Sequence, residues 1–432
     1  MPVALAFALL PAALVALVAA LRAPLRFLLA LYAFLLPFGS AISLPIGLPP
    51  PFDTPTSVVG LLVIAGILVH LLFVPRSAPR LLPAVPVWLA FATFVGLSFA
   101  WSVDARLTVD EVAILLSLVI LYALVMLMPV EKADLRRVEE AVVLGGAVAG
   151  AYGIALLLGS GFAVTNNRFA VAGGVGKGID PNITAATLVL PLAIAVGRAI
   201  RATTNLARVA FWTAGALIAA AIVLTGSRGG ILSALAVIAV LVLNHPRRAR
   251  IAIVGLGIVV IAAGTLAIAP DGLQRRITRP GSSGRTDIWR TALTRCDRFC
   301  IAGSGYGTFP TVYQDALHSE PSARGMDLPF VAHSIWIGAL IETGIVGALL
   351  MVFALALVGR DLLRLPMEVR GPPLAGFVGV LVASTFLSTL GFKYFWMVLI
   401  YAGLSTLAHE TESAAAARTR PVHVPRMIVR QA

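Results

Sequence analysis

The chain has 432 residues, of which 59% are hydrophobic and only 12% are charged, and its formal net charge is +13. Soluble domains carry roughly 25% charged residues, so this composition excludes a string of soluble domains and indicates a polytopic membrane protein. The positive charge does not indicate nucleic-acid binding, because membrane sidedness explains the positions of the basic residues better. With only two cysteines, Cys296 and Cys300, the chain cannot build a four-cysteine metal cluster.

Apolar runs long enough to cross a hydrocarbon layer of ~30 Å need about 20 residues. The candidates lie near 3–20, 27–46, 57–74, 83–101, 111–130, 139–159, 183–199, 206–225, 229–243, 251–269, 333–358, 373–389 and 392–408. Several are short, and a charged residue opens the run at 229–243. The sequence therefore predicts an all-α polytopic integral membrane protein with about 12–13 transmembrane helices.

The basic residues predict the side of each connection. Most of them follow the odd-numbered runs or lie in the C-terminal tail, whereas the short even-numbered links carry only Arg106, Arg168, Lys177, Arg228 and Lys393. Because basic residues are retained on the cytoplasmic face, the N-terminus is predicted outside and the C-terminus inside. The first run has no positive charge before it, which favours an uncleaved anchor over a cleaved signal peptide.

These runs divide the chain into five predicted parts. They are N-terminal transmembrane helices (1–160), central transmembrane helices with short outer loops (161–270), a partly helical periplasmic loop (271–332), C-terminal transmembrane helices (333–408) and a basic cytoplasmic tail (409–432). Loops as long as 271–332 are often functional in compact proteins, so this loop is the first candidate for a site. The tail is expected to contact anionic lipid.

Arg168 precedes a glycine-containing stretch and then Asp180-Pro181-Asn182, which opens the seventh run. Asp or Asn beside Pro at the start of an apolar run is typical of a helix N-terminus, so Asp180 and Asn182 are expected to be caps rather than catalytic groups. Arg168 is equally compatible with a surface charge and with a ligand for an anion.

Arg228 lies between two apolar runs in the sequence Gly226-Ser227-Arg228-Gly229-Gly230. An arginine within a span costs about 2.5–3.5 kcal/mol, and such residues are functional by default. Its small neighbours leave the guanidinium room to project into a cavity. The alternative is a tight outer turn with an interfacial arginine.

Arg285 stands in the first turn of a predicted helix in the long loop, Gly284-Arg285-Thr286-Asp287-Ile288-Trp289. The helix dipole disfavours a cation there, and such local conflicts often mark functional residues. A salt bridge to a nearby acid is the alternative. In the same loop, Cys296 and Cys300 lie on the side where disulfides persist. Their spacing on one helix suits a bond poorly, so pairing requires a break in the helix, and both redox states remain open.

His333 lies where the long loop re-enters the membrane. An imidazole at such a boundary can accept a proton from a hydroxyl, although an interfacial anchor or a helix cap is the alternative. Glu342, nine residues later, faces the other side of the helix and is interpreted as a polar tie between helices. His333 shares the predicted outer face with Arg168, Arg228 and Arg285, which together predict a pocket for a polyanion.

In their order along the chain, these motifs resemble the O-antigen ligase and O-antigen polymerase (Wzy-type) superfamily of bacterial membrane glycosyltransferases. The likeness covers about residues 165–350, and it includes Gly303-Ser304-Gly305-Tyr306-Gly307 and Leu340-Ile341-Glu342-Thr343-Gly344 as well as the motifs above. The sequence departs from the pattern at Ser334, where relatives more often have Asn. It also has one predicted span more than the twelve or so of ligases.

The resemblance implies that a glycan moves from undecaprenyl diphosphate to a hydroxyl of lipid A–core. The reaction would take place at the periplasmic face of the bacterial inner (cytoplasmic) membrane, without metal, cofactor or nucleotide sugar. It implies that Arg228 and Arg285 bind the diphosphate and that His333 activates the hydroxyl. Arg168, Arg290 and Ser334 are predicted to bind substrate.

Two other functions remain open at this stage. An O-antigen or exopolysaccharide polymerase would use the same donor and pass the glycan to a second carrier-linked glycan. A polysaccharide or lipid transporter or flippase would be expected to show repeated halves and ionisable residues at the midplane. No repeat is visible in the sequence, and the unusual charges gather on one predicted face, which favours an enzyme.

Overall fold

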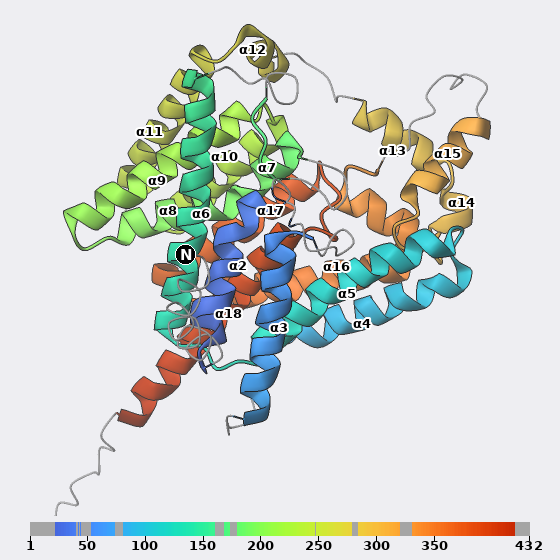
Figure 1. Ribbon diagram of the computed structural model, residues 1–432, viewed down its shortest axis with the longest axis horizontal. Helices are drawn as coiled ribbons and strands as arrows, with labels where there is room; N and C mark the ends of the chain where they lie inside the picture. The colour runs from blue at the N-terminus through green and yellow to red at the C-terminus, as the bar shows by residue number, and fades with distance from the viewer. Residues whose placement is uncertain are drawn as a thin grey trace, which may run out of the picture.

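The computed structural model describes residues 22–39, 42, 44, 53–73, 81–159, 168–172, 179–246, 248–278, 284–319 and 331–419. Within these ranges the chain forms helices and no strand, which confirms the predicted all-α fold (Figure 1). The predicted span near 3–20, Lys177 and the end of the tail, 420–432, lie outside the described residues.

The helical segments come in the following order along the chain. They are η1 (Leu25–Leu29), α2 (Ala30–Leu35), η2 (Leu36–Phe38), α3 (Pro55–Phe73), α4 (Ala84–Leu97), η3 (Ser98–Trp101), α5 (Ala105–Met126), α6 (Lys132–Gly159), α7 (Pro181–Thr187), α8 (Val189–Arg201), α9 (Asn205–Leu224), α10 (Arg228–Leu243), α11 (Arg248–Ala267), α12 (Asp271–Thr278), α13 (Arg285–Leu293), α14 (Cys296–Phe299), α15 (Phe309–Ser319), α16 (Ile335–Arg364), α17 (Met367–Ser384) and α18 (Lys393–Thr419).

Seven segments of the described chain are long and apolar enough to cross a membrane. They are Pro55–Phe73, Ala84–Trp101, Ala105–Met126, Lys132–Gly159, Pro181–Arg201, Asn205–Leu224 and Ile335–Arg364. The segment Leu25–Phe38 and α10 are apolar but shorter, and α11, α17 and α18 occupy the remaining predicted spans. The chain is therefore a multi-pass membrane protein.

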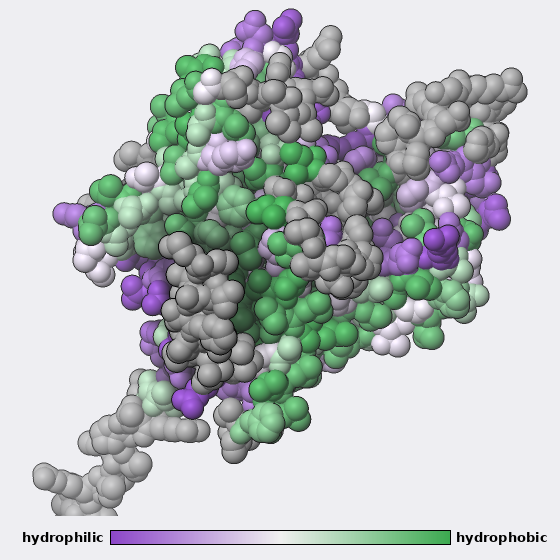
Figure 2. Space-filling view, viewed as in Figure 1, coloured by the Kyte–Doolittle hydropathy of each residue, from purple (hydrophilic) through white to green (hydrophobic). Residues whose placement is uncertain are grey.

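Among these seven segments α7–α8 is the most deeply buried, with 83% of its most apolar window buried against 33–44% for the others. Residues 394–408 of α18 are buried as well. The outer helices expose aliphatic side chains such as Leu61 and Leu349, and apolar residues cover much of the face seen in Figure 2. Lipid rather than water is the natural solvent for such a surface.

The two ends of the bundle differ. Figure 1 places α12, α13 and α15 along its upper side and the end of α18 at the opposite, lower side. Near the α18 side, Arg198 pairs with Glu139 at 2.8 Å, and the Tyr401 hydroxyl donates to the same carboxylate at 2.8 Å. Arg26 pairs with Asp134 at 3.0 Å. Basic residues at this end are thus neutralised by acids of neighbouring helices.

Helix α16 is broken at Gly344, which has φ +63° and ψ −172°. The break exposes backbone groups that a membrane helix must satisfy internally. The loop after α14 satisfies them: the Ser304 N–H donates to the Ile341 carbonyl at 3.0 Å, and the Gly305 N–H donates to the Glu342 carbonyl at 3.0 Å. The Glu342 carboxylate accepts the Phe309 N–H at 3.1 Å, so Glu342 ties α16 to α15.

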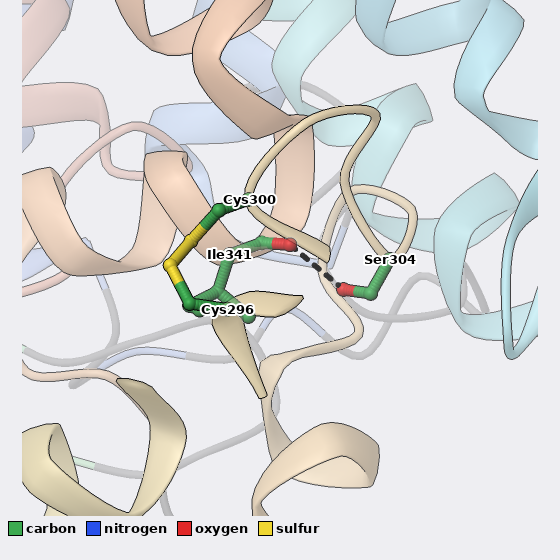
Figure 3. The surroundings of a disulfide bond; sticks show 4 residues. All are labelled: Cys296, Cys300, Ser304 and Ile341. Atoms are coloured by element: carbon green, nitrogen blue, oxygen red, sulfur yellow. Dashed lines mark hydrogen bonds between the residues drawn. A yellow bond between two sulfur atoms is a disulfide. The ribbon is translucent and has the colours of Figure 1, made fainter. Parts of the chain in front are cut away.

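Cys296 and Cys300 form a disulfide whose Cα atoms are 4.6 Å apart, within the range that such a bond accepts. The expected break in the helix is present, because α14 is a single turn that ends before Cys300. Figure 3 shows the bond beside the hydrogen bond between Ser304 and Ile341. The Cys300 carbonyl also accepts the Ile345 N–H at 2.9 Å, so the disulfide holds the backbone that docks on the break.

We expect Gly344→Ala to destabilise the protein. The backbone conformation at Gly344 is essentially restricted to glycine and costs other residues about 1–3 kcal/mol. An added methyl group would also meet the backbone of Ile301 and Ala302. The apparent unfolding temperature in detergent should fall by several degrees.

The control is Gly359→Ala in the same helix, where the methyl group would make ordinary contact with the Phe377 side chain at 3.4 Å. This variant should melt like the wild type or slightly higher, because alanine is the better helix former. Equal unfolding temperatures for the two variants would contradict the structural role given to the break.

Candidate functional site

The site begins at Arg168, which joins two spanning segments. Its Nε donates to the Thr225 carbonyl at 2.7 Å, just after α9, and its Nη2 donates to Asn182 Oδ1 at 3.1 Å, in the first turn of α7. Asp180 caps α7 as expected, accepting the N–H groups of Asn182 and Ile183. The expected capping role of Asn182 is wrong, because this residue lies inside the first turn and its side chain instead accepts from Arg168.

The turn between α9 and α10 lies next to Arg168. Gly226 adopts φ +61°, and a side chain there would meet Arg168 Nε at 3.5 Å and Arg276 Cδ at 3.7 Å. Arg276 of α12 therefore crosses the turn beside Arg168. Ser227 is buried and caps α10 by accepting the Gly230 N–H at 3.2 Å, which leaves Arg228 as the first residue of the helix.

Arg285 approaches the same turn from α13. Its guanidinium carbon lies 5.8 Å from the centre of the Phe386 ring, a cation–π distance. Phe386 follows the end of α17, and a methyl group on Gly229 would lie 3.2 Å from its ring. The ring thus packs between the start of α10 and Arg285, so it sets how closely Arg285 approaches Arg228.

The electrostatics show that these arginines share one region. Burial and the positive charges of Arg276 and Arg285 together lower the pKa of the Arg168 guanidinium to about 10. Burial also lowers the pKa of Arg285, with Arg228 and Arg276 adding repulsion. The Asp180 carboxylate opposes both shifts. We call these four arginines the arginine site.

Arg168, Arg228 and Arg285 are half-buried, whereas Arg276 is exposed at the edge of the site. Guanidinium groups that repel one another favour an anion between them. A diphosphate offers oxygens for several charge-assisted hydrogen bonds at once. The chemistry of the arginine site is therefore that of a polyanion receptor.

The segment that carries His333 is anchored to elements of the arginine site. The Trp289 indole donates to the carbonyl of Ala332, the preceding residue, at 2.8 Å. Trp289 is one helical turn after Arg285 and shares its face of α13. On the other flank, the Trp336 indole donates to Thr385 Oγ1 at 3.3 Å, next to Phe386. Both indoles thus fasten the start of α16 to elements that carry the site.

The backbone at His333 is unusual, since its φ of +45° lies in the left-handed region. Among the described residues it is the only residue other than glycine with positive φ. Histidine tolerates this conformation better than most residues, but strained positions cluster at functional sites.

The comparison with known families agrees with this geometry. Residues 213–352 match the family model described as O-antigen ligase (Wzy_C). This part of the chain is similar to the O-antigen ligase family. The matched segment runs from α9 into α16 and contains Arg228, Arg276, Arg285 and His333, whereas Arg168 precedes it. The resemblance predicted from the motifs is thereby confirmed. No curated protein matches the chain.

Two of the predicted substrate-binding residues lie apart from the arginine site. Arg290 is exposed near the end of α13, five positions and about 140° around the helix from Arg285. Ser334 is 2% exposed, and its hydroxyl caps α16 by accepting the Ile337 N–H at 3.5 Å. Its observed contact is thus a structural one.

Two residues of the site are absent from the sequence predictions. Arg276 lies among the basic residues of the long loop, and its proximity to Arg168 becomes visible only once α12 folds over the turn at Gly226. Phe386 ends an apolar run on the predicted outer side. An aromatic residue near the outer end of a predicted span could have been noticed in the sequence. The sequence does not reveal which arginine this residue contacts.

We expect inorganic pyrophosphate to stabilise the purified protein, because a ligand that binds only the native state raises the unfolding temperature. Arg285→Gln should remove most of this shift, since the variant loses a half-buried charge of the arginine site. Thermal unfolding at low salt measures the effect. The control is Arg106→Gln, which changes an exposed arginine at the start of α5. A pyrophosphate shift that Arg285→Gln leaves intact would contradict the assignment of the site.

Proposed function

We propose that this protein is an O-antigen ligase-like glycosyltransferase. It moves a glycan from undecaprenyl diphosphate to a hydroxyl of lipid A–core at the periplasmic face of the bacterial inner membrane. The observation that carries the proposal is the arginine site, which gathers four guanidinium groups near the segment of His333. Three of them, Arg228, Arg276 and Arg285, lie in the segment that the O-antigen ligase family model matches.

The arginines bind the diphosphate of the donor and stabilise it as the leaving group. Negative charge develops on the diphosphate as the bond to the sugar breaks, and positioned donors in a half-buried site stabilise such charge strongly. Each charge-assisted hydrogen bond contributes about 1.5–3 kcal/mol. Because the guanidinium groups already repel one another, the anion also relieves an electrostatic cost of the empty site.

Arg168 is fixed by Thr225 and Asn182 through two of its donor groups, which supports a role in substrate binding with a preset orientation. Arg290 and Ser334 remain predictions. The exposed position of Arg290 suits a contact with the glycan better than one with the diphosphate. We propose that no metal or cofactor takes part, since the guanidinium groups supply the charge that neutralises the diphosphate.

His333 acts as the general base. The acceptor oxygen attacks C1 of the carrier-linked sugar while its proton passes to the imidazole. The bond between C1 and the phosphate oxygen breaks, and its electron pair leaves with the lipid diphosphate. This single displacement inverts the configuration at C1, so a product with retained configuration would contradict it. A positioned base contributes typically ~10²–10⁴-fold to the rate.

The sidedness of the proposal rests on charge. The connections predicted to face the cytoplasm hold most of the basic residues. The arginine site and the helices of the long loop belong to the other end of the bundle, opposite the end of α18 (Figure 1). Transfer at that end requires a donor that has already crossed the membrane, as carrier-linked glycans do.

We expect His333→Ala to abolish glycan transfer while the protein still inserts and folds, since the variant loses its base but keeps the arginine site. The assay incubates purified protein with a lipid-diphosphate glycan and lipid A–core and follows the size of the product. One added block on the core lipid supports a ligase, whereas a ladder of carrier-linked glycan would identify a polymerase instead. Wild-type turnover by the variant would remove the catalytic role of His333.

Arg228→Lys should also impair transfer, by about tenfold or more, because an ammonium group cannot grip two oxygens as a planar guanidinium does. The loss should appear in donor affinity, measured as KM for the lipid-diphosphate glycan. Arg106→Lys serves as the matched control and should leave this KM unchanged. A donor affinity that Arg228→Lys does not alter would argue against direct diphosphate binding by Arg228.

A further inference from the structure

A second polar cluster lies at the mouth of an apolar cleft, away from the arginine site. Lys393, the first residue of α18, donates to Ser57 Oγ at 2.6 Å, Thr56 Oγ1 at 2.9 Å and Thr54 Oγ1 at 3.3 Å. The three hydroxyl residues stand at the start of α3. No carboxylate of the described residues comes within 4.0 Å of the ammonium group, although Asp53 lies near enough to attract it.

The cleft behind this cluster lies between α3 and α5. Ile64, Ile114, Leu118 and Leu121 line it, together with Gly60 and Tyr32. Its walls suit a hydrocarbon chain, and Leu61 on its rim is 45% exposed on the lipid-facing surface.

The positive charge of Lys393 at the mouth of the cleft favours an anionic ligand. Hydroxyl groups solvate the Lys393 ammonium but do not neutralise it, and a half-buried charge among aliphatic neighbours is costly. The positive ends of α3 and α18 lie at the same place and add to the potential. A ligand that fits both features carries a phosphate at one end and an apolar chain at the other.

The cleft and the arginine site open at the same end of the bundle. Gly391, which borders the cleft, lies near Glu111 of α5, and Glu111 packs against Gly307 in the loop that docks on the break in α16. Nevertheless, the two sites have no residue in common. One diphosphate held by the arginines therefore does not account for the charge at Lys393, and a reaction between two lipid-linked substrates needs a second lipid site.

We propose that this cleft binds the lipid that carries the acceptor glycan. A phosphate of that lipid contacts Lys393 and the hydroxyls of α3, and one of its acyl chains lies between α3 and α5. The inference rests on the proposed function, because it takes the arginine site as the donor site. It assigns Lys393 to acceptor binding rather than to the chemical step.

The test uses the full protein in phosphatidylcholine nanodiscs with lipid A that carries a photoreactive diazirine on one acyl chain. Crosslinks should map to residues 57–64 and 114–121, identified by mass spectrometry of the peptides. Lys393→Met should reduce crosslinking about tenfold or more, the loss expected for a charge-assisted hydrogen bond, and Lys393→Arg should retain it. Thr56→Val, which keeps the shape but removes one hydroxyl, should give a smaller loss.

Competition identifies the occupant. Unlabelled lipid A should displace the probe, whereas lipid A stripped of its phosphates should not. Equal displacement by phosphatidylglycerol would identify a bulk phospholipid and overturn the proposal. Displacement by undecaprenyl diphosphate that Arg285→Gln abolishes would assign the cleft to the donor and overturn it as well. Crosslinking that Lys393→Met leaves unchanged would remove the role of Lys393.

Kinetics separates this inference from the proposed function. Lys393→Met should raise the KM for lipid A–core about tenfold and leave the KM for the lipid-diphosphate glycan unchanged. An increase confined to the KM of the donor would overturn the inference. If the wild-type protein transferred no glycan at all, the proposed function would fail, and the crosslinking result would still decide whether lipid A occupies the cleft.

Discussion

The constraint on which the site depends is repulsion between guanidinium groups in a half-buried place. Arg168, Arg228, Arg276 and Arg285 come from four separate parts of the chain. The burial of Arg168 and Arg285 and the mutual repulsion of the four charges act against their meeting. The fold holds them by other means: Arg168 through a carbonyl and an amide, and Arg285 through the ring of Phe386. A bound polyanion replaces the repulsion among the guanidinium groups by attraction to the ligand. The same four positive charges therefore destabilise the empty site and provide its affinity for an anion.

The break in α16 provides the rigidity that such an arrangement requires. A continuous helix would offer no free carbonyl groups to the loop after α14, and the loop would lack its anchor. Gly344 opens the helix, Ser304 and Gly305 fill the opening, and the disulfide of Cys296 and Cys300 closes the adjoining turn. The start of the same helix carries His333, so the anchoring of the loop and the position of the proposed base are mechanically linked.

Most of the fold was predictable from the sequence because hydropathy is a local property. Apolar runs of about 20 residues marked the helices, and Asp180 before Pro181 marked the start of α7. Arg228 and Arg285 stood out for a similar reason, since each conflicts with a local rule for charged residues. His333 stood out by its position where the long loop re-enters the membrane. Contacts between segments that are distant in the sequence could not be predicted from such local features. Arg276 beside Arg168, Phe386 beneath Arg285 and Lys393 beside Ser57 depend on helix packing, while Ser334 turned out to be a buried cap.

The central claim is that the arginine site grips the diphosphate of a lipid carrier. An experimental density map of the protein with bound undecaprenyl diphosphate tests it most directly. The account predicts both phosphates within hydrogen-bond distance of the Arg228 and Arg285 guanidinium groups, with His333 facing the position of the sugar. A diphosphate bound elsewhere, with those two side chains turned away from it, would contradict the account.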